Sequence, residues 1–498
     1  MKVLFINPEP KNYTRARCAP LGLLSIASYL NANGHTAKIL NRPIKKTDIA
    51  EELDSFMPDF VGCSFTSLMP IEDGILVSEE AKRRNIRVVW GGQYITCNYT
   101  LFHELDCFDF ISMGEGEETW LELCNAAENN IDLKTVAGLA YKDENNKMVT
   151  TAERPFMDLR KLPPIDYSLV DTEKTLYINY DYDKTVAMYL SKGCNASCTF
   201  CYNKAFHKSC YRERNIDHLI EEAHYLKENC GVNAISFADE FFGYNKENLT
   251  RICNTFIEKD LDLYWGCMTK IGIFDKEDFE LMYKAGCRWI EFGVESGAPS
   301  TLRRMKKALL PERVETDLRN CTQAGLITLC YFIVGFPDET EEELRETCSL
   351  LNRIRYTKFI CSHFNPLVGS EAYDNLVKEG RLTPHTSYKE ELGSVSFKSL
   401  SCNYSKVKSL DLKVVRNYIL WCSLFRKSFK DNNKTDYAIL KRDVTDVLKS
   451  LKGHGFKEGI HQFFSSATEF LEAFYYANFF PSIIRKYGLD LKVGKEQE

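Results

Sequence analysis

Short apolar runs alternate with amphipathic segments over the first 150 residues. The runs that predict strands are Lys2–Ile6, Thr36–Leu40, Phe60–Phe65, Arg87–Trp90 and Phe108–Ser112. The segments between them with helical spacing of apolar positions include Leu21–Ala32, Asp73–Arg84 and Glu117–Glu128. Strands separated by helices of this length predict an α/β fold with a parallel, doubly wound, Rossmann-like sheet. In such a sheet a ligand binds beyond the carboxyl ends of the strands.

A second series of strand and helix patterns follows a proline-containing stretch, 151–184, that we expect to be a linker. Its expected strands are Thr185–Leu190, Ala234–Ala238, Leu263–Met268, Trp289–Gly293, Thr328–Val334 and Phe359–Phe364. Six βα units predict a partial (βα)6 barrel of the TIM type, with its chemistry at the carboxyl ends of the strands. Tyr177, Tyr180 and Tyr182, directly before this series, are expected to pack against the fold, and a place in a pocket is the alternative.

The last part of the chain, from about residue 405, combines helical spacing with many aromatic residues. We expect a small helical subdomain whose rings pack on the barrel, and an apolar substrate pocket is the alternative. The expected division of the chain is 1–150 for the Rossmann-like domain, 151–184 for the linker, 185–385 for the barrel and 386–498 for the helical C-terminal domain.

The composition predicts a globular protein of more than one domain, because 498 residues exceed one core of ordinary size. The formal net charge is -6 and no strongly basic run occurs, which argues against a nucleic-acid partner. We find neither a signal peptide nor an apolar run long enough for a membrane span, so we expect a cytoplasmic protein. The 19 cysteines are scattered through apolar segments, which predicts reduced thiols and would suit an anaerobic host.

The strongest chemical signal is the segment Gly193–Cys201, in which Cys194, Cys198 and Cys201 follow the first expected barrel strand. Thiolates are soft ligands that suit iron–sulfur clusters. Three cysteines leave one iron of a [4Fe-4S] cubane without a protein ligand, and that iron can chelate S-adenosylmethionine (SAM). The alternatives are a zinc site, which usually has four ligands with paired cysteines, and three unrelated buried thiols.

This Cys-x3-Cys-x-Phe-Cys loop resembles the signature of the radical SAM superfamily. Further motifs of that superfamily have counterparts at the expected strand ends, although the two glycines of its Gly-Gly-Glu motif are absent from Phe237–Glu240. The resemblance implies SAM contacts at Phe200, Asp239, Glu240, Lys270, Glu295, Ser296, Val334 and Gly335. The alternatives are structural: helix capping by Asp239 and Glu240, a satisfied buried carboxylate at Glu295, and a turn glycine at Gly335.

The first 150 residues resemble the cobalamin-binding domain that precedes many radical SAM barrels. The resemblance implies cobalamin contacts at Asn7, Pro8, Leu21, Gly22, Ser64, Thr66, Gly91, Gly92, Gly114, Glu115 and Gly116. The Asp-x-His-x-x-Gly motif, whose histidine ligates cobalt, is missing, and we expect His35 to be a surface or core residue. Cobalamin would then bind base-off without that ligand. The alternative is a domain that kept the shape and lost the cofactor.

Together the resemblance covers about residues 1–370 and implies an enzyme similar to class B radical SAM methyltransferases. The implied cofactors are a [4Fe-4S] cluster, SAM and cobalamin, and the implied reaction is C-methylation of an unactivated carbon through a 5'-deoxyadenosyl radical. The implied partners are a small-molecule or peptide substrate and an external electron donor such as flavodoxin or ferredoxin. No catalytic side chain is assigned.

Three other functions stay open from the sequence. The first keeps the same cofactors but performs a rearrangement, cyclisation or oxidation. The second is an RNA methylthiotransferase with a second cluster at Cys18, Cys63 and Cys97, whose surroundings do not resemble the cluster loops of that family. The third is a binding or regulatory protein without enzymatic activity, against which the intact cysteine loop argues.

Overall fold

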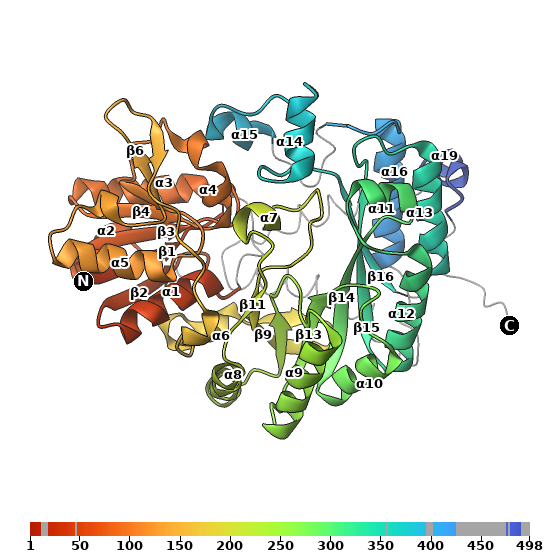
Figure 1. Ribbon diagram of the computed structural model, residues 1–498, viewed down its shortest axis with the longest axis horizontal. Coiled ribbons are helices and arrows are strands. Elements are labelled where there is room, and N and C mark those ends of the chain that lie inside the picture. The colour runs from red at the N-terminus through yellow and green to blue at the C-terminus, as the bar shows by residue number, and fades with distance from the viewer. Residues whose placement is uncertain are drawn as a thin grey trace.

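The protein is built on two seven-stranded sheets (Figure 1). The computed structural model describes residues 1–10, 18–44, 47–354, 357–394, 402–424, 475–476 and 479–489. Among these residues, no helix has both the length and the apolar character needed to cross a bilayer.

The N-terminal sheet has the strand order β2-β1-β3-β4-β5-β6-β7. Its five parallel strands are β1 (Lys2–Asn7), β2 (Thr36–Asn41), β3 (Phe60–Ser64), β4 (Arg87–Gly91) and β5 (Phe110–Ser112). An antiparallel hairpin of β6 (Leu139–Lys142) and β7 (Met148–Thr150) extends the sheet at one edge. The expected doubly wound sheet is therefore confirmed, and the hairpin is an addition that the sequence patterns did not predict.

Both faces of this sheet are buried. Val3 and Phe5 of β1 belong to the core shared with α1 (Leu21–Ala32) and α5 (Glu117–Glu128). Leu4 and Ile6 belong to the core on the other face, with α2 (Ile49–Phe56) and α3 (Ile71–Arg83). Continuous apolar strands are typical of parallel sheets that helices cover on both sides.

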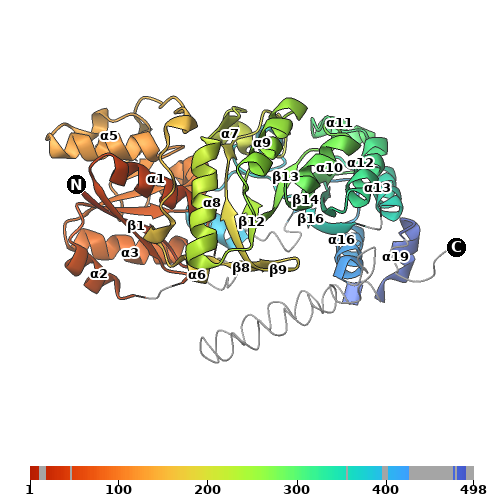
Figure 2. The same ribbon diagram turned by 90° about the horizontal axis from the view of Figure 1, so that it is seen from below.

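The second sheet has the strand order β16-β15-β14-β13-β12-β9-β8. Its six parallel strands are β9 (Tyr182–Met188), β12 (Ala234–Phe237), β13 (Tyr264–Thr269), β14 (Cys287–Glu295), β15 (Ile327–Val334) and β16 (Lys358–His363). The helices that accompany them are α8 (Ile216–Cys230), α9 (Lys246–Glu258), α10 (Lys276–Lys284), α11 (Pro299–Arg304), α12 (Pro311–Gln323) and α13 (Glu341–Arg353), along one side of the sheet (Figure 2). The predicted partial barrel is confirmed.

Burial alternates along the barrel strands. In β15, Cys330, Phe332 and Val334 are fully buried or nearly so, whereas Leu329 and Tyr331 remain partly accessible. Since neighbouring side chains of a strand point to opposite faces, the first set packs under the helices and the second faces the concave side, here called the lumen. The core of the barrel thus lies between the sheet and its helices.

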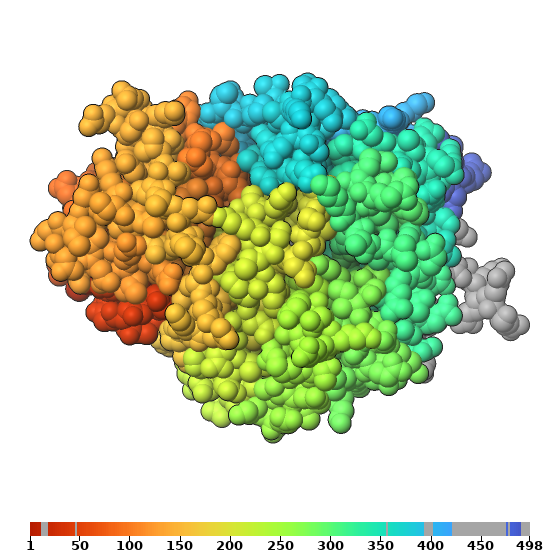
Figure 3. Space-filling view, in the orientation of Figure 1, coloured from red at the N-terminus to blue at the C-terminus, as the bar shows by residue number. Residues whose placement is uncertain are grey.

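The edge strand β8 (Tyr177–Asn179) pairs antiparallel with β9 and lies in the stretch that was expected to be a linker. Its three residues carry too little periodicity to predict a strand, and only the exposed edge of β9 gives them a partner. After the barrel come α14 (Glu371–Lys378) and α15 (Tyr388–Ser394), and this part of the chain, cyan in the space-filling view, lies between the orange N-terminal part and the green barrel (Figure 3). Tyr388 stacks on Phe102 of the N-terminal part, with ring centroids 5.8 Å apart.

Only part of the expected C-terminal helical region belongs to the described residues. Helix α16 (Ser409–Leu424) packs on β16, and α19 (Pro481–Lys486) packs on α16. The Tyr487 hydroxyl donates a hydrogen bond to Asp411 of α16 over 2.9 Å. Most of the aromatic stretch between 463 and 480 lies outside the described residues, so its predicted role is not tested.

The close packing of β13 on β14 gives a stability prediction. A Cβ atom at Gly266 would lie 2.0 Å from Cε2 of Trp289, which is fully buried. We expect Gly266→Ala to lower the free energy of unfolding by about 1–3 kcal/mol through overpacking. Thermal unfolding of the apoprotein, followed by circular dichroism, measures the change. Gly22→Ala is the control, since a Cβ atom there would have no neighbour within 4 Å; equal melting temperatures for the two variants would contradict the packing.

Candidate functional site

The three cysteines of the predicted cluster motif lie on one loop at the carboxyl end of β9. The short strands β10 (Ser191–Lys192) and β11 (Arg212–Glu213) pair antiparallel and close this loop. Gly193 has φ +82°, and a Cβ atom there would lie 2.1 Å from the Cys210 carbonyl oxygen. Only glycine fits this backbone position, so the loop geometry depends on the residue that directly precedes the first cysteine.

The thiols of this loop are free, and helix α7 (Asn203–Phe206) supports them. The Asn203 side chain donates to the Cys194 carbonyl over 2.7 Å, and its backbone N–H points at Cys201 Sγ over 3.4 Å. In the described part of the chain, no three His, Cys, Asp or Glu side chains converge as ligands of a single ion. A four-iron cluster holds its thiolates farther apart than one ion does, and soft thiolates suit it. The loop fits such a cluster.

Two lysines bring positive charge to the cysteine loop. Lys270 Nζ lies 3.2 Å from Asn195 Oδ1 and 4.0 Å from the centroid of the Phe241 ring. Lys307 Nζ lies 3.2 Å from Glu295 Oε1, and its side chain is only 14% exposed. Burial lowers the pKa of Lys307, but the charges of Glu295 and of the nearby Cys198 outweigh burial and raise the pKa above its usual value. Lys307 therefore stays charged beside the loop.

The end of β12 places Asp239 and Glu240 differently. Asp239 is buried and accepts hydrogen bonds from Leu190 N over 3.0 Å and Ser191 N over 2.6 Å, and burial raises its pKa to about 7. Glu240 accepts from Gly193 N over 2.9 Å and lies 3.1 Å from His207 Nε2. Asp239 thus fixes the start of the loop, whereas Glu240 lies beside it.

The ends of β14 and β15 carry the next predicted SAM contacts. Glu295 is held at φ +69° where the register of β14 shifts against β15, which is a strained position for a residue with a Cβ atom. Ser296 is buried, with its hydroxyl 3.0 Å from Thr347 Oγ1. Val334 is fully buried, and Gly335 adopts φ +80°.

A cavity of about 240 Å³ opens between these strand ends and the cysteine loop. Phe200, Glu295, Tyr331 and Ser362 are among the residues that line it. Phe200 also packs against the apolar cluster that contains Phe336. The structure therefore brings the aromatic residue of the loop and the β14 carboxylate to one cavity.

The predicted cobalamin contacts lie at the carboxyl ends of the N-terminal strands, but they differ in the space around them. A Cβ atom at Gly22 or Gly114 would have no neighbour within 4 Å, whereas one at Gly92 would lie 2.5 Å from the Phe65 carbonyl oxygen. Asn7 donates to Asn41 over 2.8 Å. In the same part of the chain, His35 is buried, with its Nε2 3.2 Å from Asn125 Oδ1, and packs in the core as expected.

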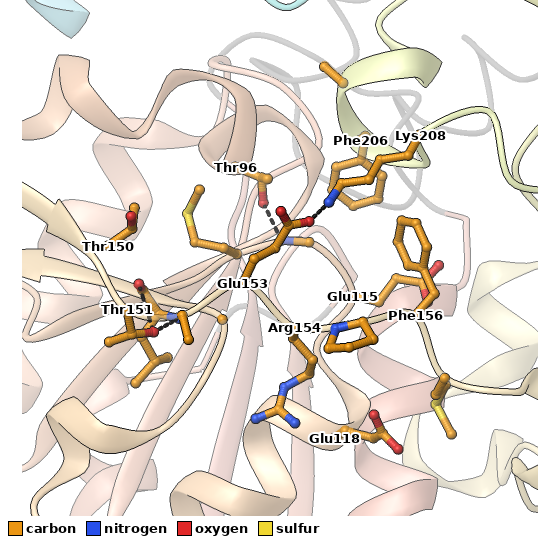
Figure 4. A pocket seen from close by; sticks show the side chains of 18 of the residues that line it. Thr96, Glu115, Glu118, Thr150, Thr151, Glu153, Arg154, Phe156, Phe206 and Lys208 are labelled. Atoms are coloured by element: carbon orange, nitrogen blue, oxygen red, sulfur yellow. Dashed lines mark hydrogen bonds and ion pairs between the residues drawn. The ribbon is translucent and has the colours of Figure 1, made fainter.

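A second cavity, of about 420 Å³, lies at this edge of the N-terminal sheet (Figure 4). Gly114 and Glu115, after β5, form part of its wall together with Phe156, and Phe206 and Lys208 enter it from the cysteine loop. Lys208 forms an ion pair with Glu153 across the cavity. The cavity is therefore bounded both by the predicted cobalamin domain and by the loop of the predicted cluster.

Ion pairs join the N-terminal sheet to the cysteine loop. Arg212 donates to both oxygens of Glu115, over 2.6 and 2.8 Å, and His207 lies between Glu115 and Glu240. Burial alone would raise the pKa of Glu115, but the hydrogen bonds from the Arg212 guanidinium hold this pKa well below its usual range. Lys192 adds a second pair with the buried Glu117 over 2.8 Å. The two strand-end regions are thus held face to face.

Comparison with known sequences matches both halves of this arrangement to families. The sequence profile of the Radical SAM superfamily matches residues 188–351, and that of the B12 binding domain matches residues 13–123. The chain belongs to the cobalamin-dependent radical SAM enzymes. Its cofactors are accordingly a [4Fe-4S] cluster, SAM and cobalamin.

Individual relatives agree with this family. An uncharacterised methyltransferase of Pyrococcus horikoshii is 29% identical over 395 residues, which are 77% of this chain and 84% of the relative. The anaerobic magnesium-protoporphyrin IX monomethyl ester cyclase of Rubrivivax gelatinosus is 30% identical, over 70% of this chain and 65% of the cyclase. The cobalamin-dependent SAM radical enzyme OxsB has the same fold, with a TM-score of 0.68 at 16% identity, over 98% of this chain and 80% of OxsB.

Sequence reasoning about this radical SAM enzyme missed Lys307 and the pairing of Glu115 with Arg212. Lys307 follows α11 and matches no motif, so only its buried contact with Glu295 reveals it. Arg212 lies 97 residues from Glu115, and no local pattern links the two. The roles predicted for individual SAM and cobalamin contacts stay predictions.

The Glu115–Arg212 pair can be tested through stability. Its side chains are 9% and 13% exposed, so Arg212→Met leaves a carboxylate without its buried partner. We expect a loss of about 3 kcal/mol in the free energy of unfolding, as measured by urea titration. The control is Arg160→Met, whose pair with Asp158 is largely exposed and should contribute less than about 1 kcal/mol. Equal losses in both variants would show that the buried pair does not stabilise the junction.

Proposed function

We propose that the protein is a cobalamin-dependent radical SAM C-methyltransferase acting on an unactivated carbon. The observation that carries the proposal is the junction itself: Glu115, at the edge of the cobalamin domain, is ion-paired to Arg212 at the base of the cysteine loop. When bound, the cluster and SAM supply the 5'-deoxyadenosyl radical and cobalamin supplies methyl-group transfer. The chain's contribution is to hold both cofactor regions close to one substrate. The relative from Pyrococcus horikoshii, named as a methyltransferase, supports this choice.

In this proposal each part of the chain has a defined task. Residues 1–150 bind cobalamin, and residues 151–184 link this domain to the radical SAM barrel. Residues 185–385 form the barrel, and residues 386–498 form the C-terminal domain. Cys194, Cys198 and Cys201 hold the cluster, while Glu240, Glu295 and Lys270 contact SAM. The position of these groups around the loop and the adjoining cavity supports their assignment.

We also propose an external electron donor, such as flavodoxin or ferredoxin, and a cytoplasmic location. Reductive cleavage of SAM consumes an electron that the chain's own side chains cannot supply. The 18 cysteines whose side chains the structure describes are free thiols, which supports a reducing compartment.

A second candidate function is cyclisation or oxidation with the same cofactors. The 30% identity to the cyclase of Rubrivivax gelatinosus is the observation that supports this second candidate. The same two cofactor regions would serve that reaction, so the geometry of the junction does not separate it from methylation.

The cluster assignment predicts the behaviour of Cys198→Ala. Loss of one of three ligands should abolish 5'-deoxyadenosine formation and lower bound iron, while cobalamin stays bound because its domain is unchanged. Anaerobic chromatography of the nucleoside product, iron analysis and the corrinoid absorption band measure these effects. Cys230→Ala, at the end of α8, is the control and should behave as the parent. Parent-level 5'-deoxyadenosine from Cys198→Ala would refute the assignment.

Methyl transfer is tested without knowledge of the substrate. The reduced holoenzyme, incubated anaerobically with SAM, should form S-adenosylhomocysteine up to the amount of bound cobalamin, because a methyltransferase must first take the methyl group from SAM. Chromatography of the products measures it, with cobalamin-free protein as the control. Formation of 5'-deoxyadenosine without any S-adenosylhomocysteine would contradict methyl transfer and favour the second candidate.

A further inference from the structure

The lumen of the barrel contains a carboxylate that the cluster, SAM and cobalamin do not account for. Glu291 lies in β14, on the strand face that also carries Gly293. Gly293 is paired with Tyr331 of β15, whose hydroxyl donates a hydrogen bond to Glu291. Both side chains are only partly buried, and Tyr331 lines the 240 Å³ cavity.

Three tyrosines lie near this carboxylate. The charge of Glu291 acts on Tyr177 and Tyr180 as well as on Tyr331, which places all three phenols near it. Burial, with a smaller contribution from this charge, raises the pKa of Tyr177 to about 12. Tyr180 also packs on Trp289, with ring centroids 5.5 Å apart.

The charge of Glu291 is not balanced within the described part of the chain. No lysine, arginine or histidine described there forms an ion pair with it, and burial raises its pKa, against a hydrogen bond from Tyr331 that lowers it. Lys358 starts β16, two strands away from Glu291, and its Nζ lies over the Tyr180 ring, 5.1 Å from the centroid. A partly buried carboxylate without a cation is a costly arrangement unless a ligand supplies one.

The same strand leads from this carboxylate to the predicted SAM contact. Glu295 is four residues further along β14, a distance of about 13 Å at ~3.3 Å per residue. Tyr331, the hydrogen-bond partner of Glu291, and Glu295 both line the 240 Å³ cavity. A substrate held at Glu291 would extend toward the reacting end of the site.

We propose that Glu291, oriented by the hydrogen bond from Tyr331, binds a cationic amino group of the substrate. A carboxylate that no side-chain cation neutralises recognises ammonium through a charge-assisted hydrogen bond. A ligand with a neutral hydroxyl group would form only the hydrogen bond, and Glu291 would repel a ligand with a carboxylate. This inference rests on the proposed function, since it names the substrate class of that reaction, and it assigns Glu291 as the anchor that sets which carbon reaches the radical.

Ligand binding tests this inference independently of turnover. We use three probes of equal chain length, n-hexylammonium, hexan-1-ol and hexanoate, titrated anaerobically into the SAM-bound holoenzyme by calorimetry. A charged hydrogen bond adds enough affinity that n-hexylammonium should bind at least about ten-fold more tightly than hexan-1-ol, with no binding of hexanoate. Equal affinity for the ammonium and the alcohol, or preferred binding of hexanoate, would overturn the proposal.

Variants locate the binding to this carboxylate. Glu291→Gln keeps the shape and removes the charge, and we expect it to weaken n-hexylammonium binding by about ten-fold, while Tyr331→Phe weakens it less. Glu312→Gln, on the outer helix α12, is the matched control. Parent affinity in Glu291→Gln would refute the site. The cluster absorption band of each variant shows whether it folds. If Glu291→Gln does not fold, the binding of the three probes to the parent and to Tyr331→Phe tests the site instead. A failure of the proposed function would instead appear in the Cys198→Ala experiment.

Discussion

The buried ion pair between Glu115 and Arg212 is the interaction on which the functional architecture depends. Glu115 follows a strand of one sheet, and Arg212 closes the cysteine loop of the other. Two opposite charges that lose most of their water are stable only while they remain together. The pair therefore fixes the distance between the cobalamin domain and the cluster loop, and His207 extends the same contact to Glu240 at the end of β12.

The strand ends show how one loop can serve several tasks at once. Asp239 uses its buried carboxylate to hold the backbone where the loop begins, which leaves the adjacent Glu240 to face the loop itself. Gly193 then allows the chain to pass directly over the Cys210 carbonyl. Rigid support of this kind keeps three thiols in place before any cofactor is bound, which reduces the entropy lost on assembly.

The barrel divides its side chains by face. Residues toward the helices are apolar and form the core, whereas the lumen carries Glu291, Tyr331 and the tyrosines near β8. A sheet that is covered by helices on one side only leaves polar groups on its concave side partly accessible. The substrate site proposed for Glu291 uses this property, because its polar atoms stay accessible to a ligand.

Local periodicity and a ligand spacing within nine residues were enough to predict the two parallel sheets, most of their strands and the cysteine loop. They did not determine the hairpin β6–β7 or the edge strand β8, whose three or four residues become strands only beside a partner. The contacts between distant groups, in contrast, became visible only in the folded chain. Arg212 pairs with Glu115, which is 97 residues away in the sequence. Lys307 contacts Glu295 from the segment after α11, which carries no motif. Tyr331 donates to Glu291 from the neighbouring strand, 40 residues away. Such contacts depend on strand register and on the docking of two sheets, and neither leaves a local pattern in the chain.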